Sequence, residues 1–254
     1  MRRRSGARGG GLYLIVLSAI SAGLMAGCGG DDGEGTPGGA GGAGGAPALS
    51  CPVERDEVLG PVDAASTGEV TVLSDEGGVK TLYIDASAGG PMEQENNPWI
   101  YVSLEKAARV DVTDPGADAS LDWDLALKRP VLRTNSGDGG PGEGGSAFLK
   151  DKAFDAVTDA EAKAASLAVE QWFEAMCVVK KDAGGYLATT FDGWYDYGGQ
   201  TTHAVTPHPG VFVVRAGKGG SLYKLEILTY YSNPDGTDGM AGGRFLVRYK
   251  AIAP

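Results

Sequence analysis

Hydrophobic and polar residues alternate with a period of two over much of the chain beyond residue 51. Alternation of this kind predicts β-strands with one buried and one solvent-exposed face. The longest example is GVFVVRAGKGGSLYKLEILTYY (210–231), where two β-rich runs flank Gly217–Gly220 and predict a hairpin. The other predicted strands are EVTVL (69–73), VKTLYID (79–85), WIYVSL (99–104), ARVDV (108–112), WDLAL (123–127), VLRT (131–134) and RFLVRYKAI (244–252).

One segment, TDAEAKAASLAVEQWFEAMC (158–177), departs from this pattern. Thr158 and Glu161 have the spacing of a capping box, which is typical of a helix N-terminus. Apolar residues then recur at helical spacing up to Met176. The pattern predicts one amphipathic helix near 158–177, packed on a sheet. No alternation of strands and helices is present, so we expect a mostly β fold, a single antiparallel β-rich domain over 51–254.

The first 50 residues have a different composition from the rest of the chain. Residues 1–10 contain several arginines and no acidic residue. The apolar run Leu12–Ile20 that follows is shorter than the about 20 residues that span a bilayer. With LMAGC (24–28) behind it, this run is typical of a signal peptide over 1–27 that ends in a lipobox. Cys28 would then be the lipidated first residue of the mature chain. Ordinary secretion with cleavage near Ala26 is the alternative.

Residues 29–50, GGDDGEGTPGGAGGAGGAPALS, contain almost nothing to bury in a core. We therefore expect 28–50 to form a lipidated, Gly-rich, flexible tether. Together with the signal peptide, the tether predicts a lipoprotein of the bacterial cell envelope, at the outer membrane or cell surface. Contact with the membrane is expected through the lipid anchor only.

Composition narrows the class of partner. The chain has 254 residues, 42% hydrophobic and 22% charged, which is an ordinary globular balance. Its formal net charge is −11. An acidic protein repels phosphate backbones, so we do not expect nucleic acid as a partner.

The chain contains three cysteines, Cys28, Cys51 and Cys177. If Cys28 carries the lipid, Cys51 and Cys177 remain as a candidate disulfide pair in an oxidising compartment. Their spacing does not show whether they lie close together, so the pairing stays open at this point.

The glycine-rich stretch after the VLRT strand contains GDGGPG (137–142), a literal match to a dinucleotide-binding pattern. That chemistry needs a helix that opens at the last glycine. Here EGGSA follows instead, and Asp138 and Glu143 would repel a phosphate. The stretch therefore does not predict a nucleotide site.

The same stretch resembles a known family. WDLAL, KRPVLRTNSG and GGPGEGGSAF, in that order from residue 123, are similar to the signature of HmuY-like haem-binding lipoproteins. NPWIYVSL (97–104) and THAVTPHPGVFVVRAGKGGSLYKLEILTYY (202–231) extend the resemblance over most of 69–250. It implies a β-rich lipoprotein that takes up haem, in some members for a TonB-dependent receptor.

Haem iron takes one or two axial ligands, among which His and Met are common. The resemblance implies that His203, in the TH-x-V-x-P block, is one ligand. An imidazole held in a loop by hydrogen bonds is the alternative for His203. The segment in which the family's other ligand should fall has no histidine, and Met176 is the nearest substitute, ahead of Met92 and Met240. Met176 also fits the apolar stripe of the predicted helix as core filler.

Three more residues are candidates for the wall of a haem pocket: Tyr195, Tyr197 and His208. His208 lies too close to His203 in the chain to reach the opposite side of the same iron. No catalytic residues and no other metal site are predicted. We expect a binding protein for haem or a related tetrapyrrole, in haem or iron acquisition, and not an enzyme. The alternative is a structural or interaction lipoprotein of the same fold that has lost haem binding.

Overall fold

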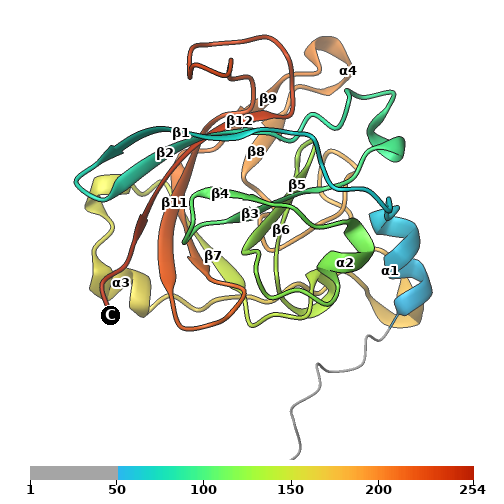
Figure 1. Cartoon of the computed structure of the whole chain (residues 1–254), viewed down its shortest axis with the longest axis horizontal. Helices are drawn as coiled ribbons and strands as arrows, with labels where there is room; N and C mark the ends of the chain where they lie inside the picture. The colour runs from blue at the N-terminus through green and yellow to red at the C-terminus, as the bar shows by residue number, and fades with distance from the viewer. Residues whose placement is uncertain (1–50) are drawn as a thin grey trace, which may run out of the picture. The chain divides into compact units, whose positions relative to one another are not determined.

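A computed structural model of the chain describes residues 51–254 (Figure 1). The predicted signal peptide (1–27), the lipidation site Cys28 and the tether (28–50) lie outside the described residues. Among residues 51–254, no helix has both the length and the apolar character that crossing a membrane requires.

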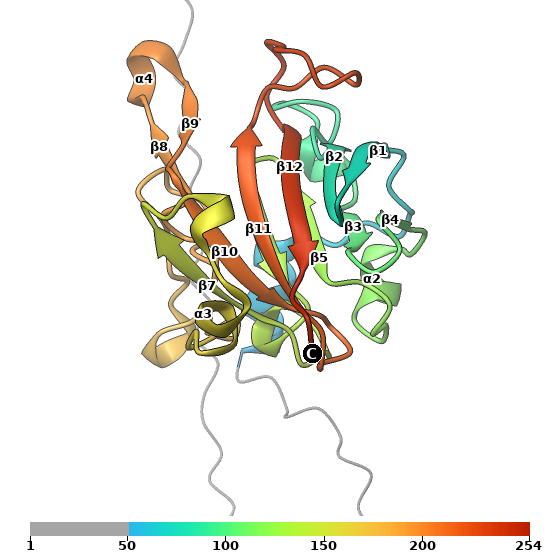
Figure 2. The ribbon, with the colours of Figure 1, turned by 90° about the vertical axis from the view of Figure 1, so that its left-hand side faces the viewer.

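The largest sheet has six strands, all paired antiparallel (Figures 1 and 2). In spatial order they are β1 (Val70–Glu76), β2 (Val79–Asp85), β12 (Arg244–Ala251), β11 (Leu222–Thr229), β10 (Gly210–Arg215) and β7 (Gly145–Lys150). The hairpin predicted over 210–231 is present as β10–β11, and β1 and β2 form a second hairpin. The C-terminal strand β12 joins them by pairing with β2 and β11.

A second antiparallel sheet has four strands, and a separate two-stranded hairpin projects from the domain (Figure 2). The four strands, in spatial order, are β4 (Ala108–Val110), β3 (Ile100–Ser103), β5 (Leu125–Lys128) and β6 (Val131–Thr134). The hairpin consists of β8 (Tyr195–Tyr197) and β9 (Val205–Pro207). The prediction of a mostly β fold with antiparallel strands is confirmed.

The main core lies between the two larger sheets. Leu82, Phe212 and Val247 of the six-stranded sheet form one buried cluster with Val102 and Leu125 of the four-stranded sheet. Burial of these side chains removes apolar surface from water, which is the main favourable term in folding. The two sheets therefore pack face to face.

The outer face of β11 is less exposed to water than the alternation predicted. Lys224 is buried and its Nζ donates to the carbonyl oxygens of Phe154 (2.9 Å) and Val157 (3.0 Å). The segment that follows β7 covers this face. A third cluster of buried side chains, which includes Phe154 and Val213, lies under that cover.

Helices are short. The α-helices are α1 (Pro52–Leu59), α2 (Asp114–Ala117), α3 (Asp159–Lys163) and α4 (Gly199–Thr202), and the 3₁₀ turns are η1 (Gln94–Asn96), η2 (Gly137–Gly139), η3 (Phe154–Ala156) and η4 (Ala175–Cys177).

The prediction of a helix over 158–177 is wrong beyond its first turn. Thr158 does cap a helix, because its side chain accepts from the Glu161 amide, but α3 ends at Lys163. Ala168 then exchanges two backbone hydrogen bonds with Ser146 at the edge of β7 (2.9 and 3.0 Å). Pairing with an existing strand satisfies the same backbone groups that a helix would, and tertiary contacts here outweigh helix propensity.

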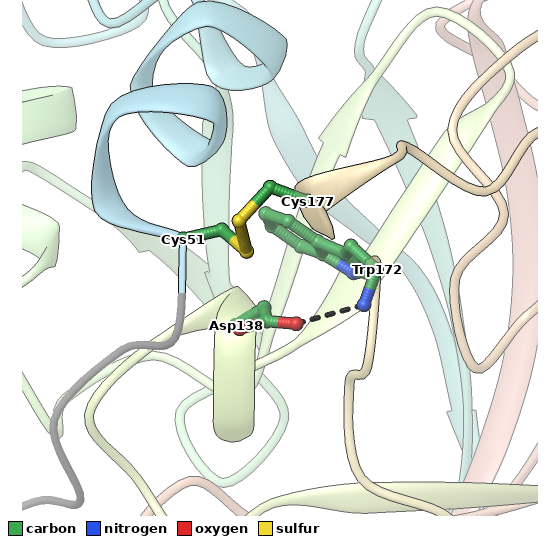
Figure 3. The surroundings of a disulfide bond; sticks show 4 residues. All are labelled: Cys51, Asp138, Trp172 and Cys177. Carbon is green, nitrogen blue, oxygen red and sulfur yellow. Dashed lines mark hydrogen bonds between the residues drawn. A yellow bond between two sulfur atoms is a disulfide. The ribbon is translucent and has the colours of Figure 1, made fainter. Parts of the chain in front are cut away.

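Cys51 and Cys177 form a disulfide between the start of α1 and the end of η4 (Figure 3). The indole of Trp172 lies beside this bond, and its backbone amide donates to the Asp138 carboxylate at 2.8 Å. The disulfide therefore fastens the N-terminal helix to the extended segment that replaces the predicted long helix.

Candidate functional site

His203 lies at the tip of the β8–β9 hairpin. The one-turn helix α4 forms this tip, and His203 ends it with a left-handed backbone (φ 52°), its amide donating to Gly199 O at 2.9 Å. A left-handed residue after the last helical turn is a common way to end a helix. The hairpin projects from the rest of the domain (Figure 2), so the imidazole is exposed.

The His203 ring is oriented by its neighbour across the hairpin. Its Nδ1 lies 2.7 Å from the hydroxyl of Tyr197, and the two ring centroids are 6.2 Å apart. Within residues 51–254, Nε2 of His203 has no hydrogen-bond partner. When Nδ1 carries the proton and donates it to Tyr197, Nε2 presents a lone pair. Metal-binding histidines are typically held in this way, with the other nitrogen donating to an oxygen.

His208 has a different environment at the base of the same hairpin. Its Nδ1 lies 2.7 Å from Gly193 O, and its Nε2 lies 2.8 Å from a carboxylate oxygen of Asp196. Both ring nitrogens are therefore engaged with other residues. His208 holds the hairpin base together and is not free to coordinate iron.

The two tyrosine candidates also differ. Tyr197 touches His203, as described above. Tyr195 points elsewhere: its hydroxyl donates to the Asp182 carboxylate at 2.7 Å and its ring packs against Trp194 at 4.6 Å. Burial, followed by the contact with Asp182, raises the pKa of Tyr195. Tyr195 therefore connects the hairpin to the preceding loop.

Met176 lies far from His203. Its neighbour Cys177 is bonded to Cys51, at the beginning of α1. Figures 1 and 2 both place the beginning of α1 and the helix α4 at opposite ends of the domain. The Met176 side chain is 95% exposed and its backbone is left-handed (φ 62°), so it is not core filler on a helix. The structure does not bring His203 and Met176 together.

The residues of the Gly-rich signature are structural. The Asn135 side chain accepts from the Gly142 amide (2.9 Å) and donates to Trp123 O (3.0 Å). A Cβ at Gly144 would lie 2.7 Å from Asn135 O, so only glycine fits there. Next to Trp123, buried Asp124 accepts from two backbone amides. The loop wraps around the Asn135 side chain, which explains its glycines without a bound phosphate.

Arg133 of the same signature occupies the centre of an aromatic cluster. Its guanidinium lies over the rings of Trp99 (4.8 Å), Trp123 (5.0 Å), Tyr101 (5.6 Å) and Trp172 (5.9 Å). Burial lowers the pKa of Arg133, and the negative faces of the four rings offset part of the cost of burying its charge. The side chain is fully enclosed, so it does not face a ligand.

A cavity of about 530 Å³ shares Trp99 with this cluster and lies between α1, the β5–β6 hairpin and the segment 179–187. Its size lies within the range of small-molecule sites. None of the ligand and pocket candidates predicted from the sequence lines it. The side chains and backbone around it belong to Glu57, Val58, Leu59, Gly60, Gln94, Glu95, Trp99, Lys128, Val131, Val179, Lys181, Tyr186 and Leu187.

Sequence reasoning missed this cavity. The available signal was Lys128, which ends the otherwise apolar run LAL of β5 and is buried in the structure. A lysine at the end of an apolar strand is usually solvated, so the pattern alone gives no reason to suspect a site.

Comparisons with known proteins identify one family. The family model described as HmuY protein matches residues 95–242, which is more than half of the chain. Among solved structures, the chain is similar to apo PinO from Porphyromonas gingivitis, with 16% sequence identity and a TM-score of 0.41. That match covers 61% of this chain and 91% of PinO. No curated protein matches the chain.

Proposed function

Because the chain belongs to the HmuY family, a family of haem-binding proteins rather than enzymes, we propose that it binds haem or a related tetrapyrrole. The bound molecule is cargo rather than a catalytic cofactor. The role that fits such cargo is haem or iron acquisition.

The contact between His203 and Tyr197 is the observation that carries this proposal. It fixes the imidazole so that Nε2 is left for iron when Nδ1 donates to the Tyr197 hydroxyl. The exposure of His203 leaves room for a flat macrocycle to approach the hairpin tip. In this proposal His203 is the single protein ligand and Tyr197 is the residue that positions it.

We further propose that the protein is a lipoprotein of the cell envelope, anchored through Cys28. The composition of residues 1–50 supports this, since a short apolar run, a lipobox-like LMAGC and a Gly-rich tether follow one another. A domain held in this way would pass haem to a membrane receptor, and a TonB-dependent receptor is the partner that the family resemblance suggests.

A haemin titration followed by visible absorbance tests the proposal. We expect a saturable change of the Soret band with the unmodified chain, and His203→Ala should weaken binding at least about tenfold because the iron loses its ligand. Tyr197→Phe should give a smaller loss, since it removes only the orienting hydroxyl. Met176→Leu is the control: it removes the other candidate ligand, which is exposed and lies far from His203, and it should leave the titration unchanged. Absence of a saturable change at micromolar haemin would refute the proposal.

The second candidate is a structural or interaction lipoprotein of the same fold that no longer binds haem. The observation that favours it is that neither of the other two histidine and methionine candidates can serve as a second iron ligand. His208 is engaged on both nitrogens, and Met176 lies at the opposite end of the domain. The same titration separates the two candidates, because this one requires the Soret band to stay unchanged.

A further inference from the structure

The cavity between α1, the β5–β6 hairpin and 179–187 has apolar walls. Trp99 and Leu59 are buried at its base, and Val131, Val179 and Leu187 are half-buried around it. Its more exposed lining residues carry charge or lack a side chain, so the charged groups lie at the mouth. An apolar cavity with a few polar groups is the usual form of a small-molecule site.

Lys128 brings one positive charge into this apolar lining. The residue is only 9% exposed, and its Nζ lies 5.9 Å from the centre of the Trp99 ring. Among residues 51–254, Nζ has neither a hydrogen bond nor an ion pair within 4 Å. Nζ itself is not fully enclosed, and Lys128 lines the cavity. A lysine with so little exposed surface usually has a partner, since removing its charge from water is costly.

The nearest buried acid does not supply that partner. Asp114 attracts Lys128, but its two oxygens are occupied by the Val62 amide (2.9 Å), the Trp99 amide (3.0 Å) and the Tyr101 hydroxyl (3.0 Å). Burial lowers the pKa of Lys128, and Asp114 and Glu95 oppose this. The ammonium therefore remains short of a direct hydrogen-bond acceptor.

We propose that this cavity is a second binding site, for a small amphipathic monocarboxylate. Its carboxylate pairs with the Lys128 ammonium, and its apolar body lies against Trp99, Val131 and Leu187. A charge-assisted hydrogen bond in a desolvated site is stronger than a neutral one, so the carboxylate determines which ligands bind.

The charges at the mouth restrict the ligand further. Glu57 and Glu95 are exposed lining residues, with Lys181 as the one exposed cation among them. A ligand with a second negative charge would meet these carboxylates. The arrangement therefore favours a monoanion, and it disfavours a tetrapyrrole that carries two carboxylates.

Isothermal titration calorimetry of the purified full chain with Cys28→Ser, which prevents lipidation and allows detergent-free buffer, tests the proposal with 1-naphthoate and its neutral isostere 1-naphthamide. We expect the carboxylate to bind at least about tenfold tighter than the amide. Lys128→Met keeps the apolar stem of the side chain and should remove this preference. Lys106→Met, at an exposed lysine outside the cavity, should keep it.

A second variant tests whether the compounds bind in this cavity, whether or not Lys128→Met folds. Leu187→Trp fills the cavity from its half-buried wall and should abolish binding of both compounds. Haemin added to the same samples reports on the hairpin site separately. Equal affinity of the unmodified chain for the two compounds, binding that survives Leu187→Trp, or displacement of naphthoate by haemin would each overturn the proposal.

Discussion

Replacing Glu170 by glutamine keeps the shape of a side chain that is buried in the segment once expected to be helical. Its carboxylate accepts from the Thr134 amide (2.8 Å), the Trp172 indole (2.8 Å) and the Thr190 amide (3.0 Å), and from the hydroxyls of Thr134 and Thr190. These bonds fasten the segment to β6 and to the loop before β8. We expect Glu170→Gln to loosen both attachments.

The magnitude follows from which donors lose their acceptor. The Thr134 amide faces Oε1, whereas the Trp172 indole and the Thr190 amide face Oε2. A glutamine NH₂ group must oppose one of these two sets, and N–H groups cannot turn into acceptors. One or two buried donors are then unsatisfied, at about 1–3 kcal/mol each. We expect a loss of about 2–4 kcal/mol in the free energy of unfolding.

The assay is urea unfolding followed by tryptophan fluorescence, with thermal unfolding beside it. For a domain of this size the expected loss corresponds to a fall in Tm of about 5–15 °C. Glu174→Gln, at an exposed position in the same segment, is the matched control and should change stability by less than about 0.5 kcal/mol.

The alternative to this reasoning is a neutral Glu170. Burial raises the pKa of Glu170, and the hydrogen bonds from Thr134, Trp172 and Thr190 oppose that rise. A protonated carboxyl group resembles glutamine, so the substitution would then cost little. A measured loss below about 1 kcal/mol would show that the donors do not keep the carboxylate ionised.

Two further predictions concern the disulfide and the buried aspartates. Because Cys51 and Cys177 are 126 residues apart, a double change to serine should lower the free energy of unfolding by about 2–5 kcal/mol, and a urea midpoint insensitive to reductant would contradict this. Burial raises the pKa of Asp114 and of Asp124, so their contribution to stability is largest below the unfolded value of about 3.9 and is lost as the pH rises through the folded pKa. Thermal unfolding at pH 5 and pH 7 checks this: Tm at pH 5 should be no lower than at pH 7, and a clear fall on acidification would refute the assignment.

Strand positions could be predicted where the local alternation of apolar and polar residues matches the buried and exposed faces of the sheet. The run 79–85 was predicted as a strand, and β2 has the same bounds. β7 was not predicted, since GGSAF has little strand propensity and gains its pairing from β10 and from Ala168, which lie elsewhere in the chain. The helix over 164–177 failed for the same reason: the partners of Ala168 and Glu170 are far away in sequence.

The candidate sites were predictable to a smaller extent. His203 could be named from its motif, but its contact with Tyr197 depends on the hairpin that brings the two rings together. The engagement of His208 by Asp196 and the exposure of Met176 could not be seen in the sequence, since both depend on three-dimensional packing. Lys128 was the one available signal, but it could not be recognised, because the cavity that it lines is formed with α1 and 179–187, which are distant in the chain.

The disulfide also determines which proteolytic cuts separate the chain into two pieces. The bond closes a covalent ring that runs from Cys51 to Cys177 and includes β1 to β7, whereas β8 to β12 lie outside it. A single cut inside the ring opens it without releasing a fragment, so the nicked chain keeps its mass on a non-reducing gel. After a single cut beyond Cys177, no covalent bond links the C-terminal piece to the rest of the chain. Only hydrogen bonds and packing then hold it in place. The hairpin that carries His203 and the strand β12 both follow Cys177. A protease can therefore separate them from the domain while the disulfide is intact.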